Sequence, residues 1–155
     1  MSVTLSDVSP GGVRVFMGTF TNGMDVHTAL AEIATRLNIG AATVEMLGGL
    51  TEVELSEYDF VNHVRKSPLT FARPLEVLSG QGTISRLDDA PHVHLHFVMS
   101  FRDEAAPHGM AVIGGHVARA TAFALEFTLT AYNGPPVQRA LHEPTGLQLW
   151  ELPAQ

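Results

Sequence analysis

The chain has 155 residues, of which 45% are hydrophobic and only 16% charged, so we expect one globular domain spanning residues 1–155. Its net charge of −7 and its nine scattered lysine and arginine residues disfavour a nucleic-acid-binding surface, which needs clustered positive charge. It has no cysteine, no signal-peptide pattern and no apolar stretch near the roughly 20 residues that span a bilayer, which predicts a cytoplasmic protein without disulfides or membrane association.

The N-terminal part predicts a strand, a turn and a helix. Residues 13–17 are predicted as a strand, and residues 20–24, which include Asn22-Gly23, are predicted as a turn. Asp25 is a suitable N-cap for a helix that runs to about Leu37. Apolar side chains recur along this segment at helical spacing, so one face should pack on the core.

The middle of the chain favours strands. Residues 42–47 and 50–55 are predicted as two strands separated by Gly48-Gly49, and residues 57–68 have no clear pattern. Residues 74–84 are apolar and β-rich, with Gly80 and Gly82 indicating a bulge or a tight bend.

The C-terminal part predicts a long strand over residues 117–131 and a stop at Asn133-Gly-Pro-Pro136. Residues 137–142 and 147–152 form a closing hairpin or extension. One helix and about seven or eight strands with short links favour an α/β fold of the α+β type, with a largely antiparallel sheet and the helix packed against it.

Histidines gather in residues 91–100, which read Pro-His-Val-His-Leu-His-Phe-Val-Met-Ser. Side chains alternate faces along a strand, so His92, His94 and His96 share one face. Several imidazoles on one face are typical of a site for a borderline metal such as zinc, which binds each nitrogen at about 2.0–2.1 Å.

A fourth histidine follows in Gly114-Gly115-His116, after a polar segment that predicts a hairpin. If the loop is centred near Ala106, paired positions sum to about 212, and His116 falls opposite His96. A shift by two residues keeps His116 on the same face, whereas a shift by one sends it to the other.

We therefore rank His94, His96 and His116 as the metal ligands. His92 lies at the strand entrance and is expected only to flank the site, and His108 lies in the hairpin tip. The remaining histidines, His27, His63 and His142, lie in unrelated segments. Ordinary polar packing of these histidines is the competing interpretation.

Four segments together resemble the plants-and-prokaryotes conserved domain, or PPC domain, along nearly all of residues 11–133. They are the GAATVEMLGG run at 40–49, PLEVLSGQGTIS at 74–85, VHLHFVMS at 93–100, and IGGH at 113–116. The resemblance implies a homotrimer, and it implies that some prokaryotic members bind metal at positions matching His94, His96 and His116. The fold also resembles that of acetolactate decarboxylase, a comparison of folds only.

Plant members of the family carry an AT-hook, to which DNA binding is attributed. Its Arg-Gly-Arg-Pro core is absent here, so the sequence resembles a stand-alone prokaryotic member. DNA binding is not carried over, because the charge balance opposes it.

Three functions stay open: a trimeric metal-binding protein, a small zinc-dependent lyase or hydrolase, and a DNA-binding regulator. Three histidines on zinc leave a fourth position for water or substrate. A carboxylate would assist as acid or base, and Glu76 is the first candidate, followed by Glu126. Arg86 and Arg119 could hold a small anionic ligand. For all four, an ordinary surface side chain is the alternative.

Gly114 and Gly115 directly precede His116 on the predicted strand, where glycine normally weakens the ladder. The pair indicates that a bulky neighbour approaches the backbone closely or that the strand bends. A substrate, a neighbouring subunit or the rings of His94 and His96 could be that neighbour, and a simple bulge is the alternative.

Overall fold

The computed structural model describes residues 4–152 of the chain. The elements, in chain order, are β1 Val13–Thr21, α1 Val26–Arg36, β2 Ala42–Ser56, β3 Tyr58–Asp59, β4 Val64–Arg65, β5 Leu69–Phe71, β6 Leu75–Leu87, β7 Ala90–Arg102, the short 3₁₀ helix η1 Pro107–Gly109, β8 Met110–Tyr132, β9 Gln138–His142 and β10 Leu147–Glu151. The predicted fold class, a largely antiparallel sheet with one main helix, is confirmed.

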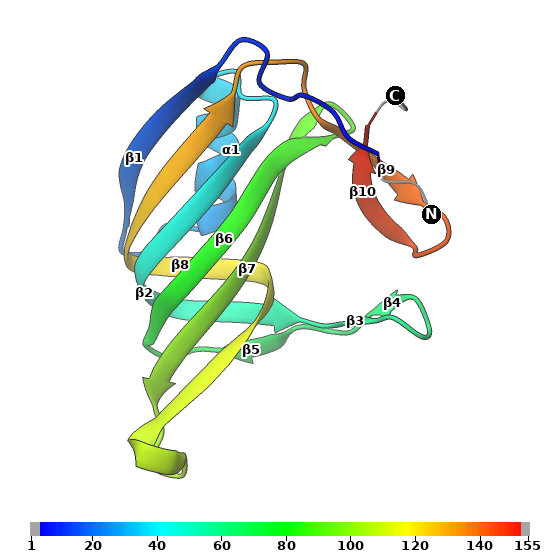
Figure 1. Ribbon diagram of the computed structural model, residues 1–155. Helices are drawn as coiled ribbons and strands as arrows, with labels where there is room; N and C mark the ends of the chain where they lie inside the picture. Colours follow the sequence, from blue (N-terminus) through cyan, green and yellow to red (C-terminus); the bar gives the residue numbers. More distant parts are fainter. Residues whose placement is uncertain (1–3, 153–155) are drawn as a thin grey trace.

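The main sheet has the strand order β10-β9-β6-β7-β8-β2-β5, with β1 also paired to β8. Because β2 pairs with β6 as well, the four strands β2, β6, β7 and β8 form a closed ring of pairings. Every pairing is antiparallel except the short parallel contact between β6 and β9. Figure 1 shows α1 behind the strongly curved sheet, while the hairpins β3–β4 and β9–β10 project on one side.

Helix α1 begins where the sequence predicted. The Asp25 carboxylate accepts a hydrogen bond of 2.8 Å from the backbone N–H of Thr28, which satisfies one donor of the first turn. Val26 and Leu30 are fully buried on the core side of the helix. The helix ends at Arg36, one residue before the predicted Leu37.

Two predicted interruptions are wrong. The Gly48-Gly49 pair does not separate two strands, because β2 is paired on both sides there and continues through a register shift between Met46 and Gly48. Gly48 adopts φ 126°, and a Cβ on it would lie 2.4 Å from the carbonyl oxygen of Ala124, so only glycine fits. Likewise, the hairpin strand that carries His116 and the predicted long strand over 117–131 form the single strand β8.

The bulge predicted at Gly80 and Gly82 lies earlier, between Val77 and Ser79, and pairing with β7 is regular through both glycines. The glycines instead give space to neighbours, since a Cβ on Gly82 would lie 2.3 Å from Leu95 Cδ2. The closing hairpin is confirmed as β9 and β10. No helix within residues 4–152 is long and apolar enough to cross a bilayer.

Candidate metal centre

Strand β7 separates an apolar face from a histidine-bearing face. Leu95, Phe97 and Met99 are at most 1% exposed and anchor one face in the core. His94 and His96 alternate with them, so their rings point to the opposite side of the strand. The burial of three large apolar side chains thus fixes the direction in which the histidines point.

The hairpin register places His116 directly opposite His96. All pairs between β7 and β8 follow that register, from Leu95 with Val117 to Arg102 with Met110. The predicted pairing, including the sum of paired positions, is confirmed. His116 therefore joins the histidine-bearing face from the neighbouring strand.

One ring nitrogen from each of His94, His96 and His116 lies within 4.8 Å of the other two. The Nε2 atoms of His94 and His96 are 3.2 Å apart, and the ring centroids are 5.0–5.4 Å apart. Two ligands of a tetrahedral zinc ion, each about 2.0–2.1 Å from it, lie roughly 3.3–3.4 Å from each other. The spacing of the first pair therefore matches that of two ligands on one ion.

The histidines are held in the neutral form that a metal needs. Burial, followed by the positive charge of Arg139, lowers the pKa of His94 to about 4. Burial, followed by the positive charge of Arg65, lowers the pKa of His116 to about 4, and the same two causes lower that of His96. A neutral imidazole keeps a lone pair free for a metal ion.

The buried Nδ1 of His116 has no hydrogen-bond partner within residues 4–152. Leaving a buried polar atom unsatisfied costs about 1–3 kcal/mol. The three histidines also offer neutral nitrogen donors, which suit ions such as zinc. The unsatisfied nitrogen and this donor set together fit a borderline metal ion.

Other histidines differ in their distance from the cluster. His92 lies on the same face of β7, opposite Ser85 on β6, but outside the group of three. His27, which the sequence placed in an unrelated segment, lies close enough for its charge to affect His92 and His116. The packing of α1 against β7 and β8 brings it there. His108 lies in the hairpin tip as expected.

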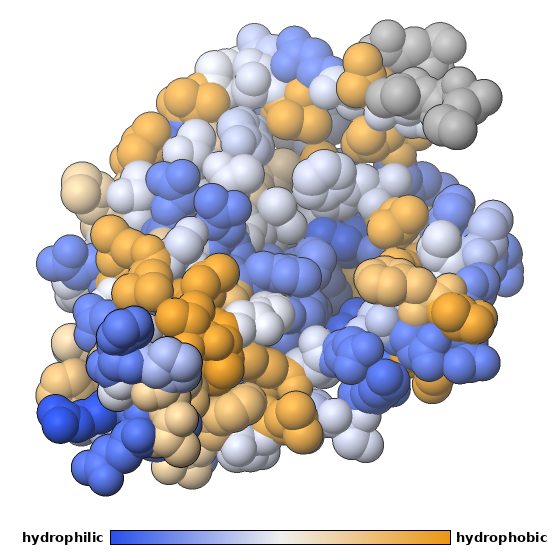
Figure 2. Space-filling model, turned by 60° about the horizontal axis from the view of Figure 1, so that its bottom comes forward, coloured by the Kyte–Doolittle hydropathy of each residue, from blue (hydrophilic) through white to orange (hydrophobic). Residues whose placement is uncertain are grey.

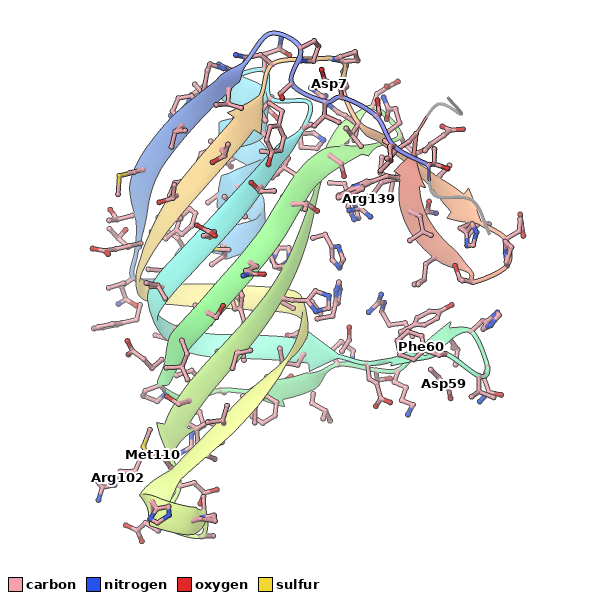
Figure 3. The ribbon with its side chains drawn as sticks, viewed as in Figure 1. Asp7, Asp59, Phe60, Arg102, Met110 and Arg139 are labelled. Carbon is pink, nitrogen blue, oxygen red and sulfur yellow. The ribbon has the colours of Figure 1, made fainter. Side chains whose placement is uncertain are left out.

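Two arginines that the sequence pattern did not indicate approach the histidines. Arg139 on β9 donates to Ser85 Oγ at 2.7 Å and to Thr83 Oγ1 at 3.3 Å. Figure 3 shows Arg139 between the main sheet and the β9–β10 hairpin. Arg65 on β4 donates to Ser56 Oγ at 3.0 Å. Ser56 is the residue of β2 that pairs with His116.

The two projecting hairpins are joined to each other. The Tyr58 hydroxyl on β3 donates a 2.5 Å hydrogen bond to the carbonyl oxygen of Thr145, in the turn between β9 and β10. The hairpins that carry Arg65 and Arg139 thus meet on the side away from β7. Figure 2 shows a hollow on the face brought forward, with hydrophilic residues on one side of it and hydrophobic residues on the other.

The other candidates lie elsewhere. Glu76 is exposed and lines a different hollow together with Glu126. It pairs with Ser100, four residues beyond His96, or about 13 Å along a strand. Arg119 forms ion pairs with Glu52 and Glu54, and Arg86 donates to the carbonyl of Asp89 in the β6–β7 turn. The acid–base role of Glu76 stays a prediction.

The glycines before His116 have two distinct explanations. A Cβ on Gly114 would lie 2.7 Å from the carbonyl oxygen of Phe97, so the close neighbour is the backbone of β7. Gly115 has φ 156°, which side-chain-bearing residues rarely adopt. The pairing between β7 and β8 is regular at both glycines, so the edge of β8 that pairs with β7 has no bulge there.

The sequence matches the family model of the Plants and Prokaryotes Conserved domain, abbreviated PCC or PPC, over residues 8–133. The protein belongs to this family, and the resemblance inferred from the sequence is confirmed. A comparison with curated protein sequences gave no match.

Solved structures share the fold. A metal-containing protein from Archaeoglobus fulgidus is 28% identical, with a TM-score of 0.81 over 97% of this chain and 99% of that one. A PPC protein from Pyrococcus horikoshii is 22% identical, with a TM-score of 0.78 over 92% and 94% of the two chains. A protein from Ralstonia eutropha, provisionally described as DNA-binding, is 23% identical, with a TM-score of 0.76 over 94% of each chain.

Acetolactate decarboxylase from Bacillus subtilis also matches, at 14% identity and a TM-score of 0.46, over 77% of this chain and 53% of that one. The predicted likeness of fold is thus present at low similarity. It carries no argument about activity.

Proposed function

We propose that this PCC-domain protein binds one divalent metal ion per chain through His94, His96 and His116, with zinc as the first choice. The observation that carries the proposal is the 3.2 Å separation of the His94 and His96 Nε2 atoms inside a three-imidazole group. The description of the Archaeoglobus fulgidus relative as metal-containing supports it. Zinc accepts three imidazoles and keeps a fourth position for water or another ligand.

The experiment is metal analysis of the purified protein. The wild type should hold one ion per chain, and the double variant His94→Ala/His96→Ala should hold none. His108→Ala is the matched control, because His108 lies in the hairpin tip outside the group. Full occupancy in the double variant would refute the ligand assignment.

We propose further that the protein assembles as a homotrimer, the arrangement that the family resemblance implies. Large apolar side chains on several strands support an interface between copies. Met17 is 84% exposed, Val112 61% and Phe123 59%. Exposed apolar groups of this kind mark surfaces that bind other protein surfaces. Light scattering should give three times the chain mass, and a monomer at every concentration would contradict the trimer.

A zinc-dependent lyase or hydrolase is the second candidate. The observation that favours it is the donor set, since three protein nitrogens with an open fourth position is the pattern of catalytic zinc. Such an ion polarises a carbonyl or lowers the pKa of bound water. Identifying the fourth ligand tests this candidate: water or a small carboxylate favours it, and a further protein side chain contradicts it.

A further inference from the structure

The first observation is the placement of Arg139 over the histidine-bearing face. Thr83 and Ser85 on β6 pair with His94 and His92 on β7, and residues paired in this way project from the same face. The guanidinium of Arg139 is bonded to both hydroxyls, so it lies on that face as well. Its third bond, to the carbonyl of Gln148 at 2.8 Å, holds it from the β10 side.

Arg65 is placed in the same manner from the other hairpin. It donates to Ser56, and Ser56 pairs with His116 across β2 and β8. The Tyr58 ring lies against its guanidinium, 5.6 Å from centroid to Cζ. Two arginines from separate hairpins therefore flank one group of three imidazoles.

Neither positive charge is compensated within residues 4–152. The ion pairs there join Lys66 to Glu57, and Arg119 to Glu52 and Glu54. A guanidinium has five N–H donors, and the hydrogen bonds found engage three nitrogens of Arg139 and one of Arg65. Both side chains therefore keep N–H groups for a further acceptor.

A divalent ion would add two more positive charges between these arginines. Uncompensated charge that is partly removed from water is costly, and a negatively charged ligand relieves the cost. The hydrogen bond from the Tyr58 hydroxyl to the carbonyl of Thr145 joins the two hairpins that carry these arginines.

We propose that the metal's open position takes a small dianion bearing oxygen ligands, a dicarboxylate or a phosphate, whose remaining oxygens accept hydrogen bonds from Arg65 and Arg139. This inference rests on the proposed metal site and names the ligand class of that site. The arginines are positioning residues: they orient the ligand, and the metal binds one of its oxygens.

The test uses the full chain loaded with cobalt(II), whose visible spectrum changes when an anion enters the coordination sphere. Malonate and inorganic phosphate are titrated separately, with acetate as the singly charged comparison. At least one dianion should bind, and more tightly than acetate. Arg65→Gln and Arg139→Gln should each weaken it by about tenfold or more, because a hydrogen bond to a charged group contributes about 1.5–3 kcal/mol.

Arg36→Gln is the matched control, since Arg36 is exposed at the end of α1 and should leave affinity unchanged. Arg139→Lys, which keeps the charge and loses the planar fork, covers the case in which Arg139→Gln does not fold. Cobalt stoichiometry separates the two proposals. A wild type that binds no cobalt refutes the metal site and this inference with it. Full cobalt with no dianion response, or equal affinity in the arginine variants, overturns this inference alone.

Discussion

His96 and His116 lie directly opposite each other on β7 and β8, with ring centroids 5.4 Å apart. The pairing depends on the hairpin register, because every side chain of a strand changes face when the register shifts by one residue. Met99 and Leu95, buried at 0% exposure on the other face, oppose such a shift. The apolar packing of the hairpin thus maintains the geometry of the imidazole group.

Zinc should stabilise the folded protein. A ligand that binds only the folded state at a free concentration of 100 times its dissociation constant adds about 2.7 kcal/mol. For a chain of this size we expect the midpoint of thermal unfolding to rise by roughly 5–10 °C. Calorimetry with and without zinc measures the shift. His116→Gln should abolish it, and an unchanged shift in that variant would argue against the site.

Acid should destabilise the metal-free protein. Burial lowers the pKa of His94 and His116 to about 4, whereas the unfolded chain titrates near 6.5. Between these values the unfolded state binds more protons, so the free energy of unfolding falls as the pH falls from about 6.5 towards 4. Thermal unfolding across this range measures the slope. The variant His94→Gln/His116→Gln should show a shallower slope, and equal slopes would contradict the assignment.

Replacing Gly115 by valine should reduce stability and metal content together. Its φ of 156° is strained for any residue with a Cβ, at a cost of about 1–3 kcal/mol, and relaxing that strain would displace the adjacent His116. Ala118→Val adds a β-branched residue at an exposed position of the same strand and serves as the control. Denaturant unfolding and metal analysis provide the two readings. If Gly115→Val matches the control in both, the glycine does not shape the site.

Duplex DNA should not be retained. The chain carries a net charge of −7, and Arg119, one of its few basic residues, is paired with two glutamates. Tight binding needs several lysine or arginine contacts to phosphates. A gel-shift assay at low micromolar protein in about 0.15 M salt tests this. Retention with a steep salt dependence would support the DNA-binding alternative.

Much of the fold and the imidazole group could be predicted because both depend on local patterns. Alternation of histidines with Leu95 and Phe97 indicated the face, and the polar hairpin tip indicated the register. The N-cap at Asp25 is likewise a short-range signal.

The arginines could not be predicted, because their positions depend on tertiary contacts. Arg65 lies in a segment without a clear pattern, and Arg139 lies on β9, which pairs with β6 although the two strands are far apart in the sequence. The predicted interruption of a strand at Gly48-Gly49 was wrong for a related reason. At Gly48 a strand continues because partners on both sides satisfy its backbone, which no local pattern reveals.

X-ray absorption spectroscopy of the zinc-loaded protein tests the three-histidine assignment most directly. The account predicts three imidazole nitrogens at about 2.0–2.1 Å and one further light-atom ligand. It also predicts that His96→Ala lowers the imidazole count. A shell of oxygen ligands without imidazole scattering, or a spectrum unchanged in His96→Ala, would contradict it.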